Sequence, residues 1–486
     1  MTEKVHLTTV QRDRAVGAII GSAAGDALGA PFEFEPPVGP DTEVALTGGG
    51  FFGWVPGEWT DDTSMALCIL QLLAEGRDLA LAETQNLLVA AWRDWAKTAP
   101  DVGMQTRSLL SSLVHANRDE ALRIGEEMHR QTGRTAGNGS LMRTGPVCLG
   151  SLGSFEATAS NARAISKLTH WDDMAGDACV LWSLAIQGAI LDGVMDIRFG
   201  IDFLPVDRRE TWLALIEEAE SNPPTVFSNN GWVVHAFQGA WSAIHLAVGS
   251  EDAIFEHPAQ RFTHGLENAV RGGYDTDTVA AIAGSLLGAY FGSTAVPASW
   301  RLKLHGWPGM DERQLSRVTH SALNQPSSDD QWPNVAKFDY STWSGRFELA
   351  QHPADPGLWM GGVGSLGNLP SEITAVVSLC RVGTEDVPER IDTRLEVFLM
   401  DKPGKENNLN AAFVFADVAD AIKDLRDAGE VVYLHCVQSQ SRTPSVAATY
   451  AIRHLGRSPK QALDEIRLVL PAAEPITYFR DIILGH

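Results

Sequence analysis

The chain has 486 residues, a hydrophobic content of 44% and a formal net charge of −23. Its length exceeds what one hydrophobic core usually supports, so we expect at least two domains. The negative charge repels nucleic-acid phosphates and anionic membranes, and no Lys/Arg cluster offsets it, which argues against both as partners.

No apolar stretch of the sequence reaches the length that spans a bilayer, and the first residues, MTEKVH, lack an apolar secretory segment. The five cysteines are scattered and form neither a disulfide framework nor a metal-ligand spacing. We therefore expect reduced thiols and a cytoplasmic location.

The first domain is predicted at residues 10–310 and is expected to be all-α, because convincing strand alternation is absent from it. Residues 14–26, RAVGAIIGSAAGD, are small or apolar on nearly every face, which indicates a buried helix with closely packed neighbours. Similar small-residue helices are predicted at 65–73, 175–191 and 279–290.

A linker is predicted at residues 311–340, where aromatic, proline and polar residues mix, most clearly at 324–337. The second domain, residues 341–486, is expected to be a small α/β domain with a mainly parallel sheet. Its strands are predicted at 358–361, 375–379, 395–399 and 431–434, and its helices at 411–428, 444–455, 459–468 and 477–484.

Two clusters of Asp and Thr stand out in the first domain, WTDDTSM at 59–65 and GGYDTDT at 272–278. Each opens an apolar helix, and one such cluster alone is more simply explained as a helix cap. Capping needs one side-chain oxygen, however, whereas these segments carry several carboxylates that repel one another. If the two clusters meet in space, a Mg²⁺ or Mn²⁺ site follows, because carboxylate, hydroxyl and water are the ligands of these ions.

Other polar segments lie among small residues of the same domain. GDALGAPFE at 25–33 ends a buried helix, and DVG at 101–103 precedes another. The glycine-rich GNGSLMR at 137–143 can turn backbone N–H groups toward a phosphate. In THWDD at 169–173, His170 taken alone is more simply a hydrogen-bonded core histidine.

These six motifs, in this order over roughly residues 12–310, resemble the ADP-ribosylglycohydrolase family, which includes the dinitrogenase reductase-activating glycohydrolases. The resemblance implies a helical bundle that holds two Mg²⁺ or Mn²⁺ ions and hydrolyses the bond between ADP-ribose and an acceptor. The acceptor can be a protein, a small molecule or a modified nucleic-acid end. Tyr274 departs from the family pattern, because it stands between two glycines and the second Asp cluster.

The resemblance also implies a role for individual residues. Glu33 assists hydrolysis or positions the sugar, Asp101 is an acid/base carboxylate, and His170 lies near the substrate. The loop that holds the diphosphate corresponds to Asn138, Gly139, Ser140 and Met142. The metal ligands correspond to Thr60, Asp61, Asp62, Asp275, Asp277 and Thr278.

Near the C-terminus, HCVQSQSRT at 435–443 joins an apolar strand to a helix. Such a loop can turn its backbone N–H groups on a phosphate, and the helix N-terminus adds positive potential. The same field favours the thiolate of Cys436 as a nucleophile, while Arg442 offers a planar fork for two phosphate oxygens.

This segment resembles the Cys-x5-Arg loop of dual-specificity and tyrosine phosphatases over roughly residues 340–486. The resemblance implies a phosphorylated substrate, Asp401 as general acid, Thr443 assisting the departure of the cysteine, and His435 orienting the loop. The family usually has glycine where this chain has Ser439; if the position requires a positive φ, serine costs about 1–2 kcal/mol. The second domain is therefore predicted to be a phosphatase or, alternatively, a phosphate-binding module without turnover.

Overall fold

The computed structural model describes residues 5–249, 254–323, 332–343 and 348–485. The chain divides into two compact units, and each is described separately. The first comprises Met1–Val296 with Lys303–Pro326, and the second comprises Pro297–Leu302 with Ser327–His486.

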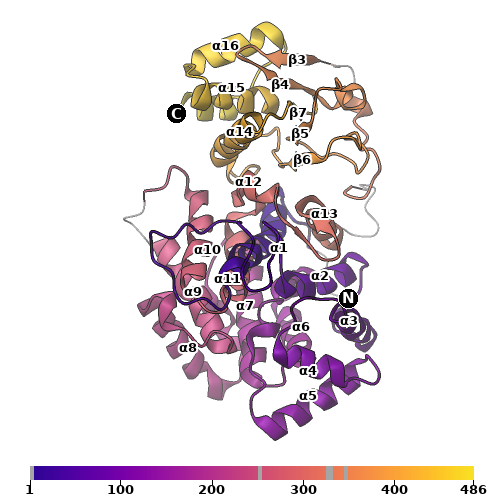
Figure 1. Ribbon diagram of the computed structural model, residues 1–486, viewed down its shortest axis with the longest axis vertical. Helices are drawn as coiled ribbons and strands as arrows, with labels where there is room; N and C mark the ends of the chain where they lie inside the picture. Colours follow the sequence, from indigo (N-terminus) through magenta and orange to yellow (C-terminus); the bar gives the residue numbers. More distant parts are fainter. Residues whose placement is uncertain (1–4, 250–253, 324–331, 344–347, 486) are drawn as a thin grey trace. The chain divides into compact units, whose positions relative to one another are not determined.

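The first unit is helical, which confirms the prediction of an all-α domain. In the described residues its strands are limited to the short antiparallel pair β1 (His305–Gly306) and β2 (Met310–Asp311). Its α-helices are α1 (Thr9–Gly29), α2 (Asp61–Ala74), α3 (Ala82–Trp95), α4 (Met104–Ser112), α5 (Arg118–Thr132), α6 (Phe155–Lys167), α7 (Asp173–Asp192), α8 (Val206–Ser221), α9 (Val233–Gly249), α10 (Arg261–Arg271), α11 (Thr276–Phe291) and α13 (Glu312–Leu323) (Figure 1).

Helices α1 and α11 form the centre of this unit, and glycines let them run antiparallel in backbone contact. A Cβ atom on Gly17 or Gly21 would overlap the carbonyl oxygen of Gly288 or Gly284, respectively. The contact is reciprocal, because a Cβ on Gly284 would overlap the carbonyl of Gly21. Only residues without a side chain permit this approach, which explains the small-residue composition of both helices.

Helices α1 and α7 also correct one expectation from the sequence. Within the described residues, Thr9–Phe32 and Asp173–Asp192 have the length and hydropathy of membrane spans. However, 89% of the apolar stretch in each of them is buried inside the structure. An apolar helix surrounded by other helices needs no polar face, so burial in the core accounts for this composition.

The second unit contains a five-stranded sheet in the order β3-β4-β7-β5-β6 (Figure 1). The β3–β4 pair is antiparallel, and the other neighbours are parallel. The strands are β3 (Leu349–His352), β4 (Asp355–Gly362), β5 (Ala375–Ser378), β6 (Thr393–Glu396) and β7 (Val432–Cys436), and the helices are α12 (Ala298–Arg301), α14 (Ala411–Asp427), α15 (Arg442–His454), α16 (Pro459–Val469) and α17 (Thr477–Leu484).

The predicted linker at 311–340 is shorter in the structure. Helix α13 belongs to the first unit and packs against α1 and α2, with Leu315 fully buried. Residues 324–331 lie outside the described residues. The segment Pro297–Leu302, predicted in the first domain, belongs to the second unit, where the backbone N–H of Ala298 donates to Oδ2 of Asp417 at 2.8 Å.

Candidate metal and phosphate sites

Asp26, near the end of α1, is fully buried and caps α2. Its Oδ1 accepts from the backbone N–H of Thr60 at 2.9 Å, and its Oδ2 accepts from the N–H and Oγ1 of Thr63 at 3.0 and 2.6 Å. A carboxylate is stabilised at a helix N-terminus by the helix dipole. Asp26 thereby fixes the first Asp/Thr cluster, a role that we did not predict; the one signal in the sequence was a carboxylate ending an apolar helix.

The second Asp/Thr cluster is held against the end of the same helix. A Cβ atom on Gly29 would overlap the backbone of Asp277, and Oγ1 of Thr276 donates to the carbonyl of Gly29 at 2.9 Å. The glycine contacts between α1 and α11 therefore determine where the second cluster lies.

The two clusters meet at the N-termini of α2 and α11. Oγ1 of Thr60 lies 3.3 Å from Oδ2 of Asp62 and 3.4 Å from Oδ2 of Asp277. Oγ1 of Thr278 lies 3.4 Å from the same Oδ2 of Asp62. The hydroxyl groups of each cluster thus contact the carboxylates of the other.

Two carboxylate triads in this cluster could hold metal ions. Ligand atoms of Asp26, Asp62 and Asp277 lie within 4.8 Å of one another, as do those of Glu33, Asp275 and Asp277. In the described residues, one buried oxygen each of Glu33, Asp62 and Asp277 has no hydrogen-bond partner. Buried carboxylate oxygens without partners are costly, and a hard divalent cation would satisfy them, so this donor set fits Mg²⁺ or Mn²⁺.

The protonation of the metal-free cluster reflects this crowding. Burial first, and then the neighbouring carboxylates, raise the pKa of Asp61 to about 8 and that of Glu33 to about 9. The same two causes raise the pKa values of Asp62 and Asp277 well above the usual range. The cluster therefore takes up protons in the absence of a cation, as like charges in a dry site must.

Asp61 belongs to neither triad, although the resemblance assigned it as a ligand. Its Oδ2 accepts from the backbone N–H of Gly103 at 3.3 Å, which ties the segment of Asp101 to the cluster. Asp101 is half-buried, and burial, followed by the charge of Asp275, raises its pKa.

The glycine-rich loop reaches the cluster through Asn138. Its Nδ2 donates to Oδ2 of Asp275 at 2.7 Å and to the carbonyl of Asn230 at 2.8 Å. Asn138 therefore orients a carboxylate of the second triad. Behind it, a Cβ atom on Gly139 would lie 3.1 Å from Cε1 of His170, so this glycine permits close contact with the ring.

Ser140 and Met142 are turned inward. They are 3% and 5% exposed, and Oγ of Ser140 accepts from Oγ of Ser166 at 2.9 Å. The backbone N–H of Met142 donates to the carbonyl of Asn138 at 3.1 Å, so it is used inside the loop.

His170 is fixed by two residues that we did not single out. Oγ1 of Thr169 lies 2.7 Å from Nδ1 of His170 and accepts from Nη2 of Arg143 at 2.6 Å. Burial, followed by the charge of Arg143, lowers the pKa of His170 well below its usual value, so the ring is neutral. Arg143 is fully buried, with its guanidinium carbon 3.9 Å from the Trp92 ring centroid.

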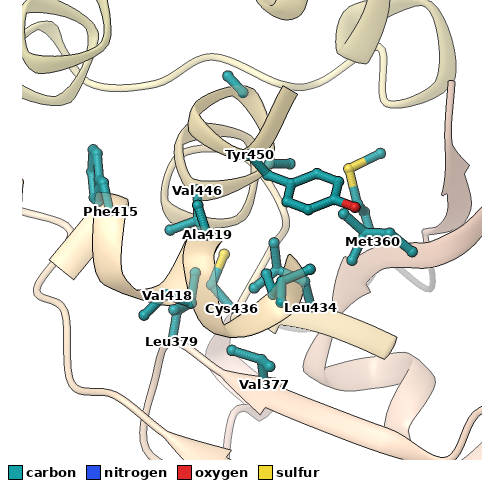
Figure 2. Packing of buried hydrophobic residues seen from close by; sticks show 14 of the residues in the cluster. Met360, Val377, Leu379, Phe415, Val418, Ala419, Leu434, Cys436, Val446 and Tyr450 are labelled. Atoms are coloured by element: carbon teal, nitrogen blue, oxygen red, sulfur yellow. The ribbon is translucent and has the colours of Figure 1, made fainter. Parts of the chain in front are cut away.

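In the second unit, β7 ends at Cys436 and α15 begins at Arg442. Cys436 is 1% exposed and belongs to a buried apolar cluster, part of which is drawn in Figure 2. Ser439 has a φ of 57°, which answers the question raised by the sequence: this position is left-handed, and serine occupies it at a cost. Within the described chain its Oγ is buried without a hydrogen-bond partner.

Arg442 is the first residue of α15, directly after this loop. Its Nη1 donates to the carbonyls of Leu379 and Leu399 at 3.1 and 3.0 Å, whereas its buried Nε has no partner in the described residues. Burial opposes its charge, but the neighbouring Cys436 and Asp401 hold the pKa of the guanidinium above its usual value. Nε of Arg442 and the hydroxyl of Ser439, which have no partner within the described chain, are therefore available to an anion.

The other residues of the phosphatase resemblance are placed as follows. Asp401 is exposed and close enough to Arg442 to interact with its charge. His435 is buried, with Nε2 2.7 Å from Oγ of Ser378, and burial lowers its pKa to about 4. Oγ1 of Thr443 donates to the carbonyl of Gly361 at 3.5 Å, which directs this hydroxyl toward β4.

The first unit is a helical bundle with a buried acidic cluster that suits divalent cations, as the sequence resemblance over residues 12–310 implies. The chain belongs to the ADP-ribosylglycohydrolase family, whose sequence model matches residues 7–329.

Individual relatives are similar over the same region. The ADP-ribosylarginine hydrolase Tri1 of Pseudomonas putida is 29% identical over 310 residues, 59% of this chain and 73% of that protein. The ADP-ribosyl-[dinitrogen reductase] glycohydrolase of Rhodospirillum rubrum is 28% identical over 301 residues, 60% of this chain and 90% of that protein.

Two solved structures are also similar. An ADP-ribosylglycohydrolase-related protein complex matches 65% of this chain and 98% of its own, with 27% identity and a TM-score of 0.45. A mouse putative dual specificity phosphatase matches 29% of this chain and 87% of its own, with 21% identity and a TM-score of 0.26. Both TM-scores lie below 0.5, so the family membership rests on the sequence match.

Proposed function

We propose that the first unit hydrolyses the bond between ADP-ribose and an acceptor, and that the acceptor is an arginine side chain of a protein. The observation that carries the proposal is the pair of carboxylate triads, three of whose buried oxygens have no hydrogen-bond partner among the residues that the structure describes, in a chain of the ADP-ribosylglycohydrolase family. Two relatives named for ADP-ribosylarginine support the choice of acceptor.

The proposed cofactors are two Mg²⁺ or Mn²⁺ ions. The residues that would hold them are Thr60, Asp61, Asp62, Asp275, Asp277 and Thr278, with Asp26 and Glu33 completing the triads. Bound cations of this kind polarise substrate oxygens and stabilise the negative charge that develops on them.

Side chains around the triads would then handle the sugar and the protons. Glu33 lies beside Asp275 and Asp277, where it can orient ribose hydroxyl groups or assist the attack of water. Asp101 is half-buried and has a raised pKa, the properties of a carboxyl group that gives a proton to a leaving acceptor. Neutral His170 and the glycine-rich loop at 137–143 would lie against the ADP moiety.

The experiment measures ADP-ribose release from an ADP-ribosyl-arginine peptide, with Mg²⁺, with Mn²⁺ and with excess chelator. Release is expected only with metal, and Asp62→Asn is expected to reduce it by about 100-fold or more. Asp119→Asn is the matched control, because this carboxylate is 85% exposed in an ion pair with Arg118. Equal activity in chelator would refute the metal-dependent mechanism.

We further propose that residues 436–443 bind the phosphate group of a phosphorylated substrate and hydrolyse its monoester. The supporting observation is the arrangement of Cys436 before a helix N-terminus, with Ser439 Oγ and Arg442 Nε buried and without a hydrogen-bond partner in the described part of the chain. Attack by the thiolate of Cys436 would form a phosphocysteine, Asp401 would protonate the leaving oxygen, and water would then release phosphate.

Binding without turnover is the second candidate, and the positive φ of Ser439 favours it. The test compares hydrolysis of an aryl phosphate by the wild type with that of Cys436→Ser. Turnover that disappears in Cys436→Ser supports a phosphatase. Equal inertness, together with phosphate binding that Arg442→Met abolishes, supports a binding module.

A further inference from the structure

Three aromatic rings gather beside the acidic cluster and are not used by the proposed chemistry. Phe34 directly follows Glu33, and Phe51 and Phe52 lie in the glycine-rich loop after it. The Phe34 and Phe51 rings meet edge to face, with centroids 5.5 Å apart at 85°, as do those of Phe51 and Phe52, 5.1 Å apart at 85°. We call Phe34, Phe51 and Phe52 the aromatic rim.

The rim is open to solvent. Phe34 is 57% exposed and Phe51 is 77% exposed, while Phe52 is partly buried and packs on Trp54 with centroids 5.7 Å apart. Single exposed phenylalanines are ordinary, but a cluster that exposes two rings against each other points to a binding surface.

Strained backbone attaches the rim to the acidic cluster. Phe34 and Tyr274 have φ values of 68° and 65°, a region that costs a residue with a side chain about 1–2 kcal/mol. The N–H of Phe34 donates to the carbonyl of Tyr274 at 2.6 Å, and the N–H of Tyr274 donates to the carbonyl of Glu35 at 2.7 Å. Such strain is retained at functional sites, and here it fixes Phe34 next to Asp275, which follows Tyr274.

The loop of the other two rings is also anchored. Gly50 has a φ of 68°, and a Cβ on it would lie 2.7 Å from the carbonyl oxygen of Ala30, so the loop packs closely against the segment that leads to Glu33. The rim is therefore positioned by the same segment that positions the carboxyl group of Glu33.

We propose that the aromatic rim binds the guanidinium group of the arginine acceptor through cation–π contacts. Ring faces carry negative electrostatic potential and attract a planar cation, and the exposed carboxylate of Glu35 beside Phe34 adds to this attraction. A neutral acceptor gains nothing from this charge, so the rim selects cationic acceptors. The inference rests on the proposed hydrolysis of ADP-ribosyl-arginine.

The test compares two peptides that differ only in the acceptor, one with ADP-ribosyl-arginine and one with ADP-ribosyl-serine. Their dissociation constants are measured by fluorescence anisotropy in excess chelator, and KM and kcat are measured with Mg²⁺. The variants are Phe34→Leu, Phe51→Leu and Phe51→Trp. The matched control is Phe199→Leu, because Phe199 is also exposed, at 43%, and pairs with Phe155 elsewhere in the unit.

Each leucine substitution in the rim is expected to raise the dissociation constant and KM of the arginine peptide about fivefold to thirtyfold, with the serine peptide unchanged. Phe51→Trp is expected to tighten the arginine peptide, because indole is the best ring for a cation. Equal weakening of both peptides would overturn the inference and assign the rim to the shared ADP-ribose. No weakening of either would remove the rim from binding.

Failure of the proposed function gives a different pattern. If the wild type binds the arginine peptide in a ring-dependent way but releases no ADP-ribose with metal, hydrolysis is refuted and the rim inference stands.

Discussion

Oγ1 of Thr60 lies 3.4 Å from Oδ2 of Asp277, although 217 positions separate the two residues in the chain. Local structure alone therefore cannot bring these two side chains together. Both are placed by α1, which holds the start of α2 through Asp26 and the start of α11 through Gly29. The candidate metal site is therefore a consequence of how one glycine-rich helix packs.

The first prediction concerns this packing. Gly25→Val puts a side chain where the carbonyl of Ala280 lies, so α1 and α11 must separate. We expect a loss of about 3 kcal/mol or more in the free energy of unfolding and weaker metal binding. Thermal unfolding and Mn²⁺ titration measure the two effects. Gly39→Val is the control, because a Cβ there meets no atom of the described residues within 4 Å, and similar losses in both variants would contradict the account.

The second prediction concerns pH and metal affinity. The carboxyl groups of Asp61 and Glu33 have pKa values of about 8 and about 9 in the metal-free chain, and a cation binds their ionised forms. Metal binding should therefore release protons, and the affinity should rise by about tenfold per pH unit for each proton released between pH 6 and 8. Calorimetric titration with Mg²⁺ in buffers of different ionisation enthalpy counts these protons. An affinity independent of pH would contradict the assignment.

The third prediction concerns stability without metal. Suppose that the pKa of a carboxyl group is higher in the folded than in the unfolded protein. Its contribution to stability is then fully present below the unfolded pKa, which is near 4, and is lost as the pH rises through the folded pKa, which is about 8 for Asp61. The melting temperature of the metal-free protein should fall between pH 6 and pH 9, and saturating Mg²⁺ should reverse the fall. If the melting temperature of the metal-free protein instead rises between pH 6 and pH 9, the prediction is wrong.

The fourth prediction concerns Arg143, which is fully buried and makes no ion pair among the described residues. An unpaired buried charge costs stability, so Arg143→Met should leave the melting temperature unchanged or higher. It also removes the donor to Thr169, which orients His170, so KM for the ADP-ribosylated peptide should rise about tenfold. A large fall in melting temperature with an unchanged KM would show a purely structural role.

The fifth prediction concerns the left-handed Ser439. Ser439→Gly removes a backbone cost of about 1–2 kcal/mol together with the hydroxyl, and should turn over an aryl phosphate faster than Ser439→Ala if the second unit is a phosphatase. Ser439→Ala keeps the strained backbone and removes only the hydroxyl. If both variants change the rate equally, the hydroxyl is responsible and the strain argument fails.

Much of the fold follows from patterns in the sequence. Small apolar residues without strand alternation predicted the helical first unit, and the predicted helix at 477–484 is α17 with the same bounds. The helix at 312–323 was missed, because Leu315 is the one apolar side chain among its three fully buried residues, Glu312, Leu315 and Thr319, and a segment with so few apolar positions also suits a linker.

The acidic cluster could be predicted only in part. Asp and Thr at two helix starts indicated a shared cation site, but no spacing in the sequence shows that Asp26 caps one of those helices. The aromatic rim was also missed. Phe34 and Phe51 are 17 positions apart, and their contact depends on positive φ values at Phe34 and Gly50 that only the folded backbone shows.

The most direct test is the anomalous diffraction of crystals soaked in Mn²⁺. The account predicts two peaks within the carboxylate triads, bounded by Thr60, Asp62 and Asp277 on one side and Glu33 and Asp275 on the other, and none in Asp62→Asn/Asp277→Asn. Crystals of the wild type that show these side chains without any peak, while the enzyme still releases ADP-ribose, would contradict it.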